Sequence, residues 1–183
     1  MKRKQYIVFF LIVAVLAALD QLIKYLIVQN FALSEEKRVF GNFLVLTYIR
    51  NEGTAWGIFA GKLVFLLILT AVITTLILYV FHNIAGYEKK YRIIRILLAC
   101  LMGGALGNLI DRIRLHYVVD YIYVKIIHFP VFNFADIFVT CSVILLVTLI
   151  IFYYKAEDFD VLIGEKVYKE DGTYEEKRSD GNK

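Results

Sequence analysis

The sequence predicts an all-α membrane protein with four transmembrane helices. Hydrophobic residues make up 60% of the 183-residue chain and the mean hydropathy is +0.64, whereas soluble domains contain about 45–50% apolar residues. Four apolar runs approach or reach the length that a bilayer-spanning helix requires. A few Asp, Asn, Lys and Arg residues interrupt or border these runs. They are candidates for function, because hydrocarbon disfavours unpaired charge.

The first predicted helix covers about residues 6–28. It follows a basic start and is apolar except for Asp20, Gln21 and Lys24. A cleaved signal peptide also begins with basic residues and an apolar core. Here the apolar character resumes after Asp20, and the whole run approaches the roughly 20 residues that span a bilayer. We therefore expect the helix to be retained.

A long connection at 29–62 is expected to contain extended structure. Residues 39–49 are rich in β-branched and aromatic side chains, and Gly41 and Asn42 are turn signals, a pattern that predicts strand. Small and polar residues then surround Trp56, a residue type that is enriched at membrane–water interfaces. We therefore place this connection at a membrane surface.

Three further apolar runs complete the predicted membrane domain, which covers residues 1–154. The runs predict helices at about residues 63–81, 93–113 and 137–154. A short basic loop separates the second helix from the third. A second long connection, 114–136, separates the third helix from the fourth.

The orientation is predicted from the distribution of positive charge. The N-terminal residues and the 82–95 loop are short and basic, so the positive-inside rule places them in the cytoplasm. Residues 155–183 are hydrophilic and highly charged, and we expect a disordered cytoplasmic tail. Connections 29–62 and 114–136 then face the outside. Most of the polar residues that are candidates for function belong to these connections or lie near them.

Asp120 and Asp136 are the candidates for catalysis. Both have apolar neighbours, and Asp136 falls at the outer start of the fourth helix. Two carboxylates brought together do not both ionise easily, so such a pair shares a proton. The ionised member can take a proton from water, and the protonated member can donate to a carbonyl. Alternatively, Asp136 is a helix N-cap and Asp120 is a solvated loop carboxylate, since their separation along the chain neither proves nor forbids contact.

A second group of polar residues falls near the same membrane face. Asp20 and Lys24 are four residues apart and share one side of the first helix. They form either an intrahelical ion pair or the support of a site. Asn108, Asp111 and Arg112 end the third apolar run. Here a buried Asp–Arg pair would be structural, whereas Asn108 and Arg112 could instead hold a substrate backbone.

Other chemistries are disfavoured by the sequence. The three histidines are scattered without an HExxH zinc pattern, and neither a GxSxG elbow nor a glycine-rich phosphate loop occurs. The net charge of +4 forms no long basic stripe, so no nucleic-acid partner is expected. Cys100 and Cys141 are expected to be small apolar packing residues. A proton-coupled transporter is the alternative from another class, because Asp and Lys within membranes also build proton relays.

Together, the polar motifs resemble those of the lipoprotein signal peptidases, also called signal peptidase II. The resemblance covers about residues 6–154. Its motifs are Asp20–Lys24 (DQLIK), Asn51–Trp56 (NEGTAW), Gly103–Arg112, Val118–Tyr121 (VVDY) and Phe132–Asp136 (FNFAD). Each motif alone is weak, whereas five in this order on a four-span chain are specific. Thr54, Trp56 and Tyr121 depart from the residues usual in the family, and they affect only loop packing and substrate fit.

The resemblance implies a fold and an activity. The expected fold is a four-helix bundle with a small extracytoplasmic β-rich cradle. The expected activity is that of an aspartic endopeptidase that removes signal peptides from diacylglyceryl-modified bacterial prolipoproteins, cutting just before the lipidated cysteine. No cofactor or metal ion is expected. Sensitivity to globomycin-type inhibitors is also implied, and we expect a monomer, in contact with membrane lipids, whose active site lies at the outer face of the bacterial cytoplasmic membrane.

The resemblance also assigns roles to individual residues. Asp120 and Asp136 become the catalytic dyad. The residues expected to bind the substrate or to hold the dyad are Asn51, Gly53, Gly107, Asn108, Arg112 and Asn133. Those expected to support the site are Asp20, Lys24 and Asp111.

Overall fold

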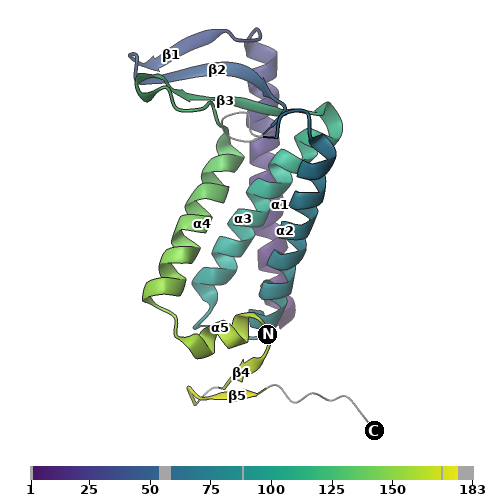
Figure 1. Cartoon of the computed structure of the whole chain (residues 1–183), viewed down its shortest axis with the longest axis vertical. Coiled ribbons are helices and arrows are strands. Elements are labelled where there is room, and N and C mark those ends of the chain that lie inside the picture. Colours follow the sequence, from purple (N-terminus) through teal and green to yellow (C-terminus); the bar gives the residue numbers. More distant parts are fainter. Residues whose placement is uncertain (1, 54–58, 88, 170, 177–183) are drawn as a thin grey trace.

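Four long helices dominate the structure, a computed structural model that describes residues 2–53, 59–87, 89–169 and 171–176. The helices are α1 (Lys2–Asn30), α2 (Leu63–Ile84), α3 (Arg92–Leu115) and α4 (Phe134–Phe152). All four are long and apolar enough to cross a membrane, and they form one bundle (Figure 1). The predicted fold class is confirmed. Thr54, Ala55 and Trp56 of the second motif lie outside the described residues.

The helix ends differ from the predicted ends by a few residues. α1 and α3 extend into the polar residues that flank their apolar runs, because backbone hydrogen bonding continues where hydropathy falls. α4 begins at Phe134, earlier than the predicted residue 137, since Asn133 supplies its N-cap. The early start places Asp136 within the first helical turn.

α3 forms the centre of the bundle. Of its most apolar window, 56% is buried, against 11–17% for the other three helices. Glycines allow the close approach of its neighbours. A Cβ atom added at Gly103 would lie 2.9 Å from the Leu16 side chain of α1, and one added at Gly104 would lie 2.5 Å from the Ala135 carbonyl oxygen of α4. α1 and α4 therefore pack on two faces of α3, and polar residues from all three helices can meet.

A small antiparallel sheet covers one end of the bundle. Its strands lie in the order β1 (Glu36–Phe40), β2 (Leu44–Asn51) and β3 (Val118–Val124), followed by a short 3₁₀ turn, η2 (Lys125–Ile127). The turn between β1 and β2 contains Gly41, whose φ of +53° favours glycine. The register of β2 against β3 pairs Ile49 with Asp120 and Asn51 with Val118. The sheet is the expected β-rich cradle, and its register brings the end of β2 close to Asp120.

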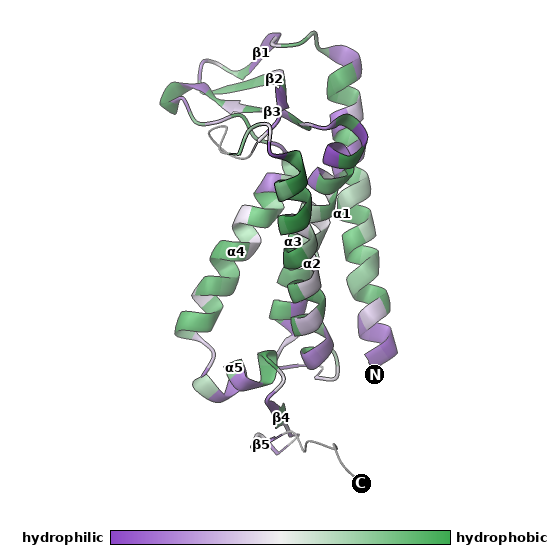
Figure 2. Ribbon diagram, turned by 45° about the vertical axis from the view of Figure 1, so that its right-hand side comes forward, coloured by the Kyte–Doolittle hydropathy of each residue, from purple (hydrophilic) through white to green (hydrophobic). Residues whose placement is uncertain are grey.

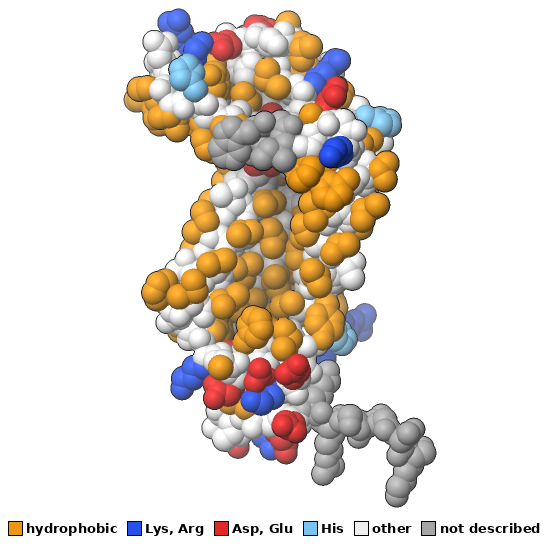
Figure 3. All heavy atoms as spheres, viewed as in Figure 1, with side chains coloured by type: hydrophobic (Ala, Val, Ile, Leu, Met, Phe, Trp, Pro, Cys, Tyr) orange, Lys and Arg blue, Asp and Glu red, His pale blue; other side chains and the backbone are white. Residues whose placement is uncertain are grey.

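The surface divides into an apolar belt and two polar ends. Hydrophobic residues cover the helices along most of their length (Figure 2). Charged side chains gather over the cradle and over the opposite end of the bundle, with few between them (Figure 3). This distribution fits four helices within hydrocarbon and two ends in water.

The chain beyond α4 differs from the disordered tail that its composition suggested. α5 (Ala156–Leu162) packs at the end of the bundle opposite the cradle, and β4 (Lys166–Tyr168) pairs with β5 (Tyr174–Glu176). Val161 and Leu162 of α5 are buried in the same apolar cluster as the ends of α2 and α3. Two apolar side chains at one end of a short helix are a weak sequence signal. They nevertheless help to order α5, because the bundle provides a surface on which they are buried.

Candidate functional site

Asp120 and Asp136 lie on different elements and line the same pocket. Asp120 belongs to β3 and is 2% exposed, whereas Asp136 belongs to the first turn of α4 and is half-buried. The pocket, of about 580 Å³, lies between the cradle, α3 and α4. The alternative in which Asp120 is a solvated loop carboxylate is therefore wrong, because Asp120 is a buried strand residue.

Asn133 connects the two carboxylates. Its side-chain Nδ2 donates to Asp120 Oδ1 at 2.7 Å, and its backbone N–H donates to Asp136 Oδ2 at 3.1 Å. Its Oδ1 accepts a hydrogen bond from the backbone N–H of Asp136 at 3.1 Å. Asn133 is therefore the N-cap of α4, and Asp136 completes its capping box from the third helical position. The alternative in which Asp136 is itself the N-cap is wrong.

Two further asparagines hold the remaining carboxylate oxygens. Asn51 Nδ2 donates to Asp120 Oδ2 at 2.8 Å, and Asn108 Nδ2 donates to Asp136 Oδ1 at 2.7 Å. Among the described residues, no Lys or Arg lies within ion-pair distance of either carboxylate. Neutral amides therefore orient both groups without neutralising them, as a proton-sharing pair requires.

A buried ion network lies directly behind the pair. Lys24 of α1 contacts Asp20 Oδ2 at 2.8 Å and Asp111 Oδ2 at 2.9 Å, and all three side chains are at most 3% exposed. Lys24 Nζ also donates to Asn108 Oδ1 at 2.8 Å. The predicted pairing of Asp20 with Lys24 is confirmed, whereas Asp111 pairs with Lys24 rather than with Arg112. A cation shared between two carboxylates compensates buried charge that would otherwise be costly.

This network connects the helices to the catalytic elements. Asp20 Oδ1 accepts the backbone N–H of Ala135 in α4 at 3.1 Å, and Asp111 Oδ2 accepts the backbone N–H of Val119 in β3 at 3.1 Å. Gly107 permits the arrangement, since a Cβ atom there would lie 2.5 Å from Asp20 Oδ2. The network therefore fixes the two backbone segments that carry the catalytic candidates.

Arg112 and Gly53 lie on another side of the same pocket. The Arg112 Nη2 atom donates to the Gly53 carbonyl oxygen at 3.2 Å, and both residues line the pocket. Asn51 Oδ1 accepts the backbone N–H of Gly53 at 2.9 Å. The connection after β2 is thereby attached to α3 at the edge of the pocket. The site residues expected from the sequence thus form one connected network of contacts around the pocket.

Burial and charge repulsion change the protonation of Asp120. Burial raises the pKa of its carboxyl and the negative charge of Asp136 raises it further, to about 7, although hydrogen bonds from Asn51 and Asn133 oppose the change. Near neutral pH, Asp120 is therefore partly protonated and Asp136 lies in the same pocket. This arrangement can supply a proton donor and a proton acceptor to one substrate.

Several residues at the site were not anticipated. Gln21 donates to Asp111 Oδ1 at 2.8 Å and to the Gly107 carbonyl oxygen at 3.1 Å. Its position beside Asp20, inside an apolar run, was the available signal. The Tyr121 hydroxyl accepts the backbone N–H of Phe134 at 3.1 Å, which joins β3 to α4. Cys141 is exposed and lines the pocket, so its expected packing role is wrong.

The lining of the pocket has two chemical characters. The cradle and α3 contribute polar groups from Asn51, Asn108, Arg112 and Asp120, and α4 contributes those of Asp136 and Thr140. Apolar side chains come from the segment 129–132 and from Ile137 of α4. Among residues that the structure describes, no group of three His, Cys, Asp or Glu side chains is arranged to hold a metal ion. The pocket thus combines two carboxylates with a surface suited to an amphiphilic chain.

Comparisons with known proteins agree with this chemistry. The family model described as "Signal peptidase (SPase) II" matches residues 12–152. The chain is 41% identical over 164 residues to the lipoprotein signal peptidase of Enterococcus faecalis (strain ATCC 700802 / V583), covering 90% of this chain and 93% of that protein. It is 40% identical over 138 residues to the lipoprotein signal peptidase of Moorella thermoacetica (strain ATCC 39073 / JCM 9320), covering 75% and 89%. A solved bacterial membrane enzyme superposes with a TM-score of 0.70 at 34% identity, covering 79% of this chain and 87% of that one.

Proposed function

The chain belongs to the signal peptidase II family, and we propose that Asp120 and Asp136 are its catalytic dyad. It is a multi-pass bacterial membrane enzyme, an aspartic peptidase that processes prolipoproteins. The observation that supports the dyad most directly is the connection through Asn133, which donates a hydrogen bond to each carboxylate. One residue thereby fixes the relative position of the two groups.

The dyad hydrolyses the peptide bond by moving protons between its members. Asp120 carries the shared proton at rest, because burial disfavours its charge. Asp136 takes a proton from a water molecule, whose oxygen attacks the scissile carbonyl carbon, while Asp120 donates its proton to the carbonyl oxygen. When the tetrahedral intermediate collapses, the C–N bond breaks. The proton held by Asp136 then passes to the leaving nitrogen, and a hydroxyl proton of the intermediate returns to Asp120.

The other site residues position this chemistry. Asn51, Asn108 and Asn133 orient the carboxylates, and Asp20, Lys24 and Asp111 hold the backbone segments that carry them. Gly107 leaves room for Asp20, while Arg112 and Gly53 form the edge that faces the substrate backbone. The asparagine amides donate hydrogen bonds to the carboxylates without adding positive charge, so the pair keeps its shared proton.

The substrate is a diacylglyceryl-modified prolipoprotein, and the cut falls just before the lipidated cysteine. The apolar residues that line the pocket support this assignment, because acyl chains can lie against them while the peptide reaches the carboxylates. Globomycin-type inhibitors occupy the same pocket. The enzyme acts as a monomer, and in its support one chain supplies both carboxylates and the described asparagines that donate to them, so the pocket needs no second subunit.

The active site faces the outside of the cytoplasmic membrane, and both chain ends face the cytoplasm. The short basic segments at the N-terminus and between α2 and α3 support this orientation through the positive-inside rule. Residues 1–154 form the membrane peptidase domain. The described part of the tail that follows is a small cytoplasmic addition to it.

A cleavage assay tests the dyad. Purified wild-type protein in detergent is expected to cut a diacylglyceryl-modified prolipoprotein peptide before the lipidated cysteine. Asp120→Asn and Asp136→Asn are each expected to abolish the cut, because either change removes the shared-proton pair while preserving shape. Asp160→Asn, which changes a carboxylate on α5, is the matched control and should cleave normally. Substantial turnover by either dyad variant would rule out the assignment.

A further inference from the structure

A second pocket lies at the end of the bundle opposite the dyad. It has a volume of about 130 Å³ and lies between the first turns of α1 and of α3. Binding sites for whole small molecules usually measure about 300–1,000 Å³. A pocket of this size therefore suits one part of a larger ligand, with the remainder outside it.

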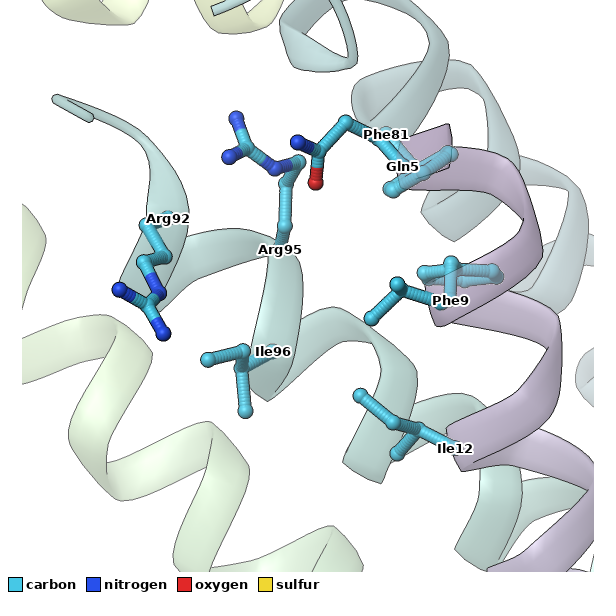
Figure 4. Close-up of a pocket in the computed structure, with 8 residues that line it drawn as sticks. Gln5, Phe9, Ile12, Phe81, Arg92, Arg95 and Ile96 are labelled. Atoms are coloured by element: carbon cyan, nitrogen blue, oxygen red, sulfur yellow. The ribbon is translucent and has the colours of Figure 1, made fainter. Parts of the chain in front are cut away.

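The lining changes from polar to apolar along both helices. On α1, Gln5 precedes Val8 and Ile12 on one helical face. On α3, Arg92 and Arg95 precede Ile96. Figure 4 shows Arg95 and Gln5 at one end of the pocket and Ile12 at the other. Two facing stripes with the same gradient match an amphiphile that has a polar head and an apolar chain.

Positive charge is concentrated at the polar end. Arg95 is 5% exposed, and its Nη1 atom donates to the Ile84 carbonyl oxygen at 3.1 Å and to that of Tyr87. Arg92 is exposed, and no ion pair between described residues includes it. The first turn of α3 contains no acidic residue. The Arg92 guanidinium and the positive end of the α3 dipole therefore favour an anion here.

The apolar part of the lining faces the lipid. Val8 and Ile96 are each 41% exposed, and they belong to helices that are long and apolar enough to cross a membrane. α4 diverges from α1 toward this end of the bundle (Figure 2). The groove between α1 and α3 is therefore open to the surroundings of the bundle, with polar residues at its end.

We propose that this pocket binds an anionic phospholipid, with its phosphate at Arg92 and one acyl chain against Val8, Ile12 and Ile96. Basic pockets between transmembrane helices at a membrane surface are suited to anionic headgroups. The site is separate from the dyad, and it takes a membrane lipid rather than the substrate. It provides a fixed contact between the α1–α3 groove and one leaflet.

Native mass spectrometry of the purified full-length protein in detergent tests the proposal. Phosphatidylglycerol, phosphatidylcholine and inorganic phosphate are the three probes. Phosphatidylglycerol is expected to remain bound, with the other two bound at least several-fold more weakly. Arg92→Gln should lower phosphatidylglycerol binding about fivefold, the effect of one basic residue near an anionic headgroup. Ile96→Trp should also lower it, because the indole fills the apolar groove without changing charge.

Arg3→Gln is the matched control, since it removes the same charge at the same end of α1 outside the pocket. It should leave phosphatidylglycerol binding within twofold of wild type. Equal losses in Arg3→Gln and Arg92→Gln would show diffuse attraction and overturn the site. Strong phosphate binding that depends on Arg92, together with no effect of Ile96→Trp, would show an ion site and overturn the lipid. Wild-type cleavage of prolipoprotein peptide by all three variants establishes that each is folded.

Discussion

At the scale of single residues, the proposed chemistry depends on the donors around Asp120. Asn51 and Asn133 each donate to one of its carboxylate oxygens, at 2.8 Å and 2.7 Å. Both bonds stabilise the charged form, whereas burial and Asp136 stabilise the protonated form. The pKa of about 7 is the balance of these effects, and changing one donor should move it in a known direction.

Removing the Asn51 donor should move the alkaline limit of activity to higher pH. In the wild type, kcat/KM should fall above about pH 7, as Asp120 loses the proton it must donate. Asn51→Leu removes a bond to a charged group, worth about 1.5–3 kcal/mol, and one pKa unit corresponds to about 1.4 kcal/mol. The limit should therefore rise by about one pH unit. The measurement is kcat/KM against pH for a lipidated peptide.

Asn30→Leu is the control for this prediction, because its amide donates to the Leu26 carbonyl oxygen, outside the dyad pocket. It should keep the wild-type pH limit. An unchanged or lower limit in Asn51→Leu would contradict the assignment of the resting proton to Asp120.

The same residue should make folding stability depend on pH. The usual pKa of an aspartate is 3.8, and that of Asp120 in the folded protein is about 7. Between these values the folded protein keeps a proton that the unfolded chain releases. This contribution is fully present below about pH 4 and is lost as the pH rises through about 7. The melting temperature in detergent should fall over that range in the wild type and less in Asp120→Asn; an equal fall in both would contradict the prediction.

These residues could be selected from the sequence, but their contacts with one another could not be predicted from it. Asp120, Asp136 and Asn133 were recognisable because polar groups beside apolar runs are unusual. The separate roles of the Asn133 backbone and side chain depend on the N-cap geometry of α4. The partners of Asp111 depend on the packing of α1 against α3, which brings Lys24 to 2.9 Å and Gln21 to 2.8 Å from its carboxylate oxygens. Such contacts follow from helix packing and were not readable from spacing.

At the scale of elements, the glycines of α3 determine how closely its neighbours approach. A Cβ atom at Gly104 would meet the backbone of α4, at the Ala135 carbonyl oxygen, 2.5 Å away. One at Gly103 would lie 2.9 Å from the Leu16 Cβ atom of α1. A change of rotamer moves neither the carbonyl oxygen nor the Cβ atom, so each contact is relieved only by a shift between helices, and the shorter distance requires the larger shift.

Gly104→Ala should therefore be more harmful than Gly103→Ala. Overpacking typically costs about 1–3 kcal/mol, and we expect Gly104→Ala at the upper end of this range and Gly103→Ala at the lower end. Because Ala135 adjoins Asp136, Gly104→Ala should also reduce kcat strongly. Thermal unfolding in detergent and peptide cleavage measure the two effects. Equal melting temperatures and turnover in the two variants would contradict the expectation that the 2.5 Å contact is more harmful than the 2.9 Å contact.

One buried carboxylate adds to the apolar contacts that hold α5 at the end of the bundle. Asp158 is 1% exposed, contacts Lys90 Nζ at 2.7 Å and accepts from the Tyr91 and Tyr174 hydroxyls at 2.5 Å and 3.0 Å. Burial raises the pKa of Asp158, but hydrogen bonds from Lys90 and Tyr91 outweigh it and hold the pKa below its usual value. The stabilising contribution is therefore present above about pH 4 and lost only as the pH falls below that range.

Asp158→Ala should destabilise the protein at neutral pH by about 1–3 kcal/mol, because it leaves Lys90 and two hydroxyls without their shared acceptor. Asp160→Ala, on the same helix, is the control. It removes a partly exposed ion pair with Lys166 and should lower the free energy of unfolding by about 0–1 kcal/mol. Melting temperatures at pH 7 provide the comparison. Equal melting temperatures of the two variants would show that Asp158 does not help to hold α5 on the bundle.

At the scale of the whole molecule, the two ends of the helix bundle carry different sequence signals, and the structure of one end could be predicted better than that of the other. At the cradle end, the small sheet was expected, and the motifs with polar residues in apolar surroundings converge there. The opposite end was predicted poorly, since α5 and the β4–β5 hairpin are short, charged and not periodic. Their order comes from docking on the bundle, where Tyr91 and Ile84 form a buried surface. Composition describes a segment alone and misses stability that arises from contact with another part of the chain.

The orientation in the membrane gives the last prediction. If the basic N-terminal end is cytoplasmic, residues on α5 are protected from reagents outside the cell, and residues on β1 are accessible. Two exposed positions report on the two ends: Arg38 of β1 and Glu157 of α5. Each is changed to Cys in a chain whose Cys100 and Cys141 are replaced by Ala, so that only one thiol can react.

A membrane-impermeant maleimide added to intact bacterial cells should label Arg38→Cys and leave Glu157→Cys unlabelled. After permeabilisation both should react, which shows that both thiols are accessible in the folded protein. The reverse pattern would place the dyad pocket on the cytoplasmic side and the Arg92 pocket outside. Prolipoproteins would then have to reach the carboxylates from within the cell, and the positive-inside assignment would be wrong. Labelling at the Arg38 end alone places substrate, cradle and carboxylates on one side of the membrane.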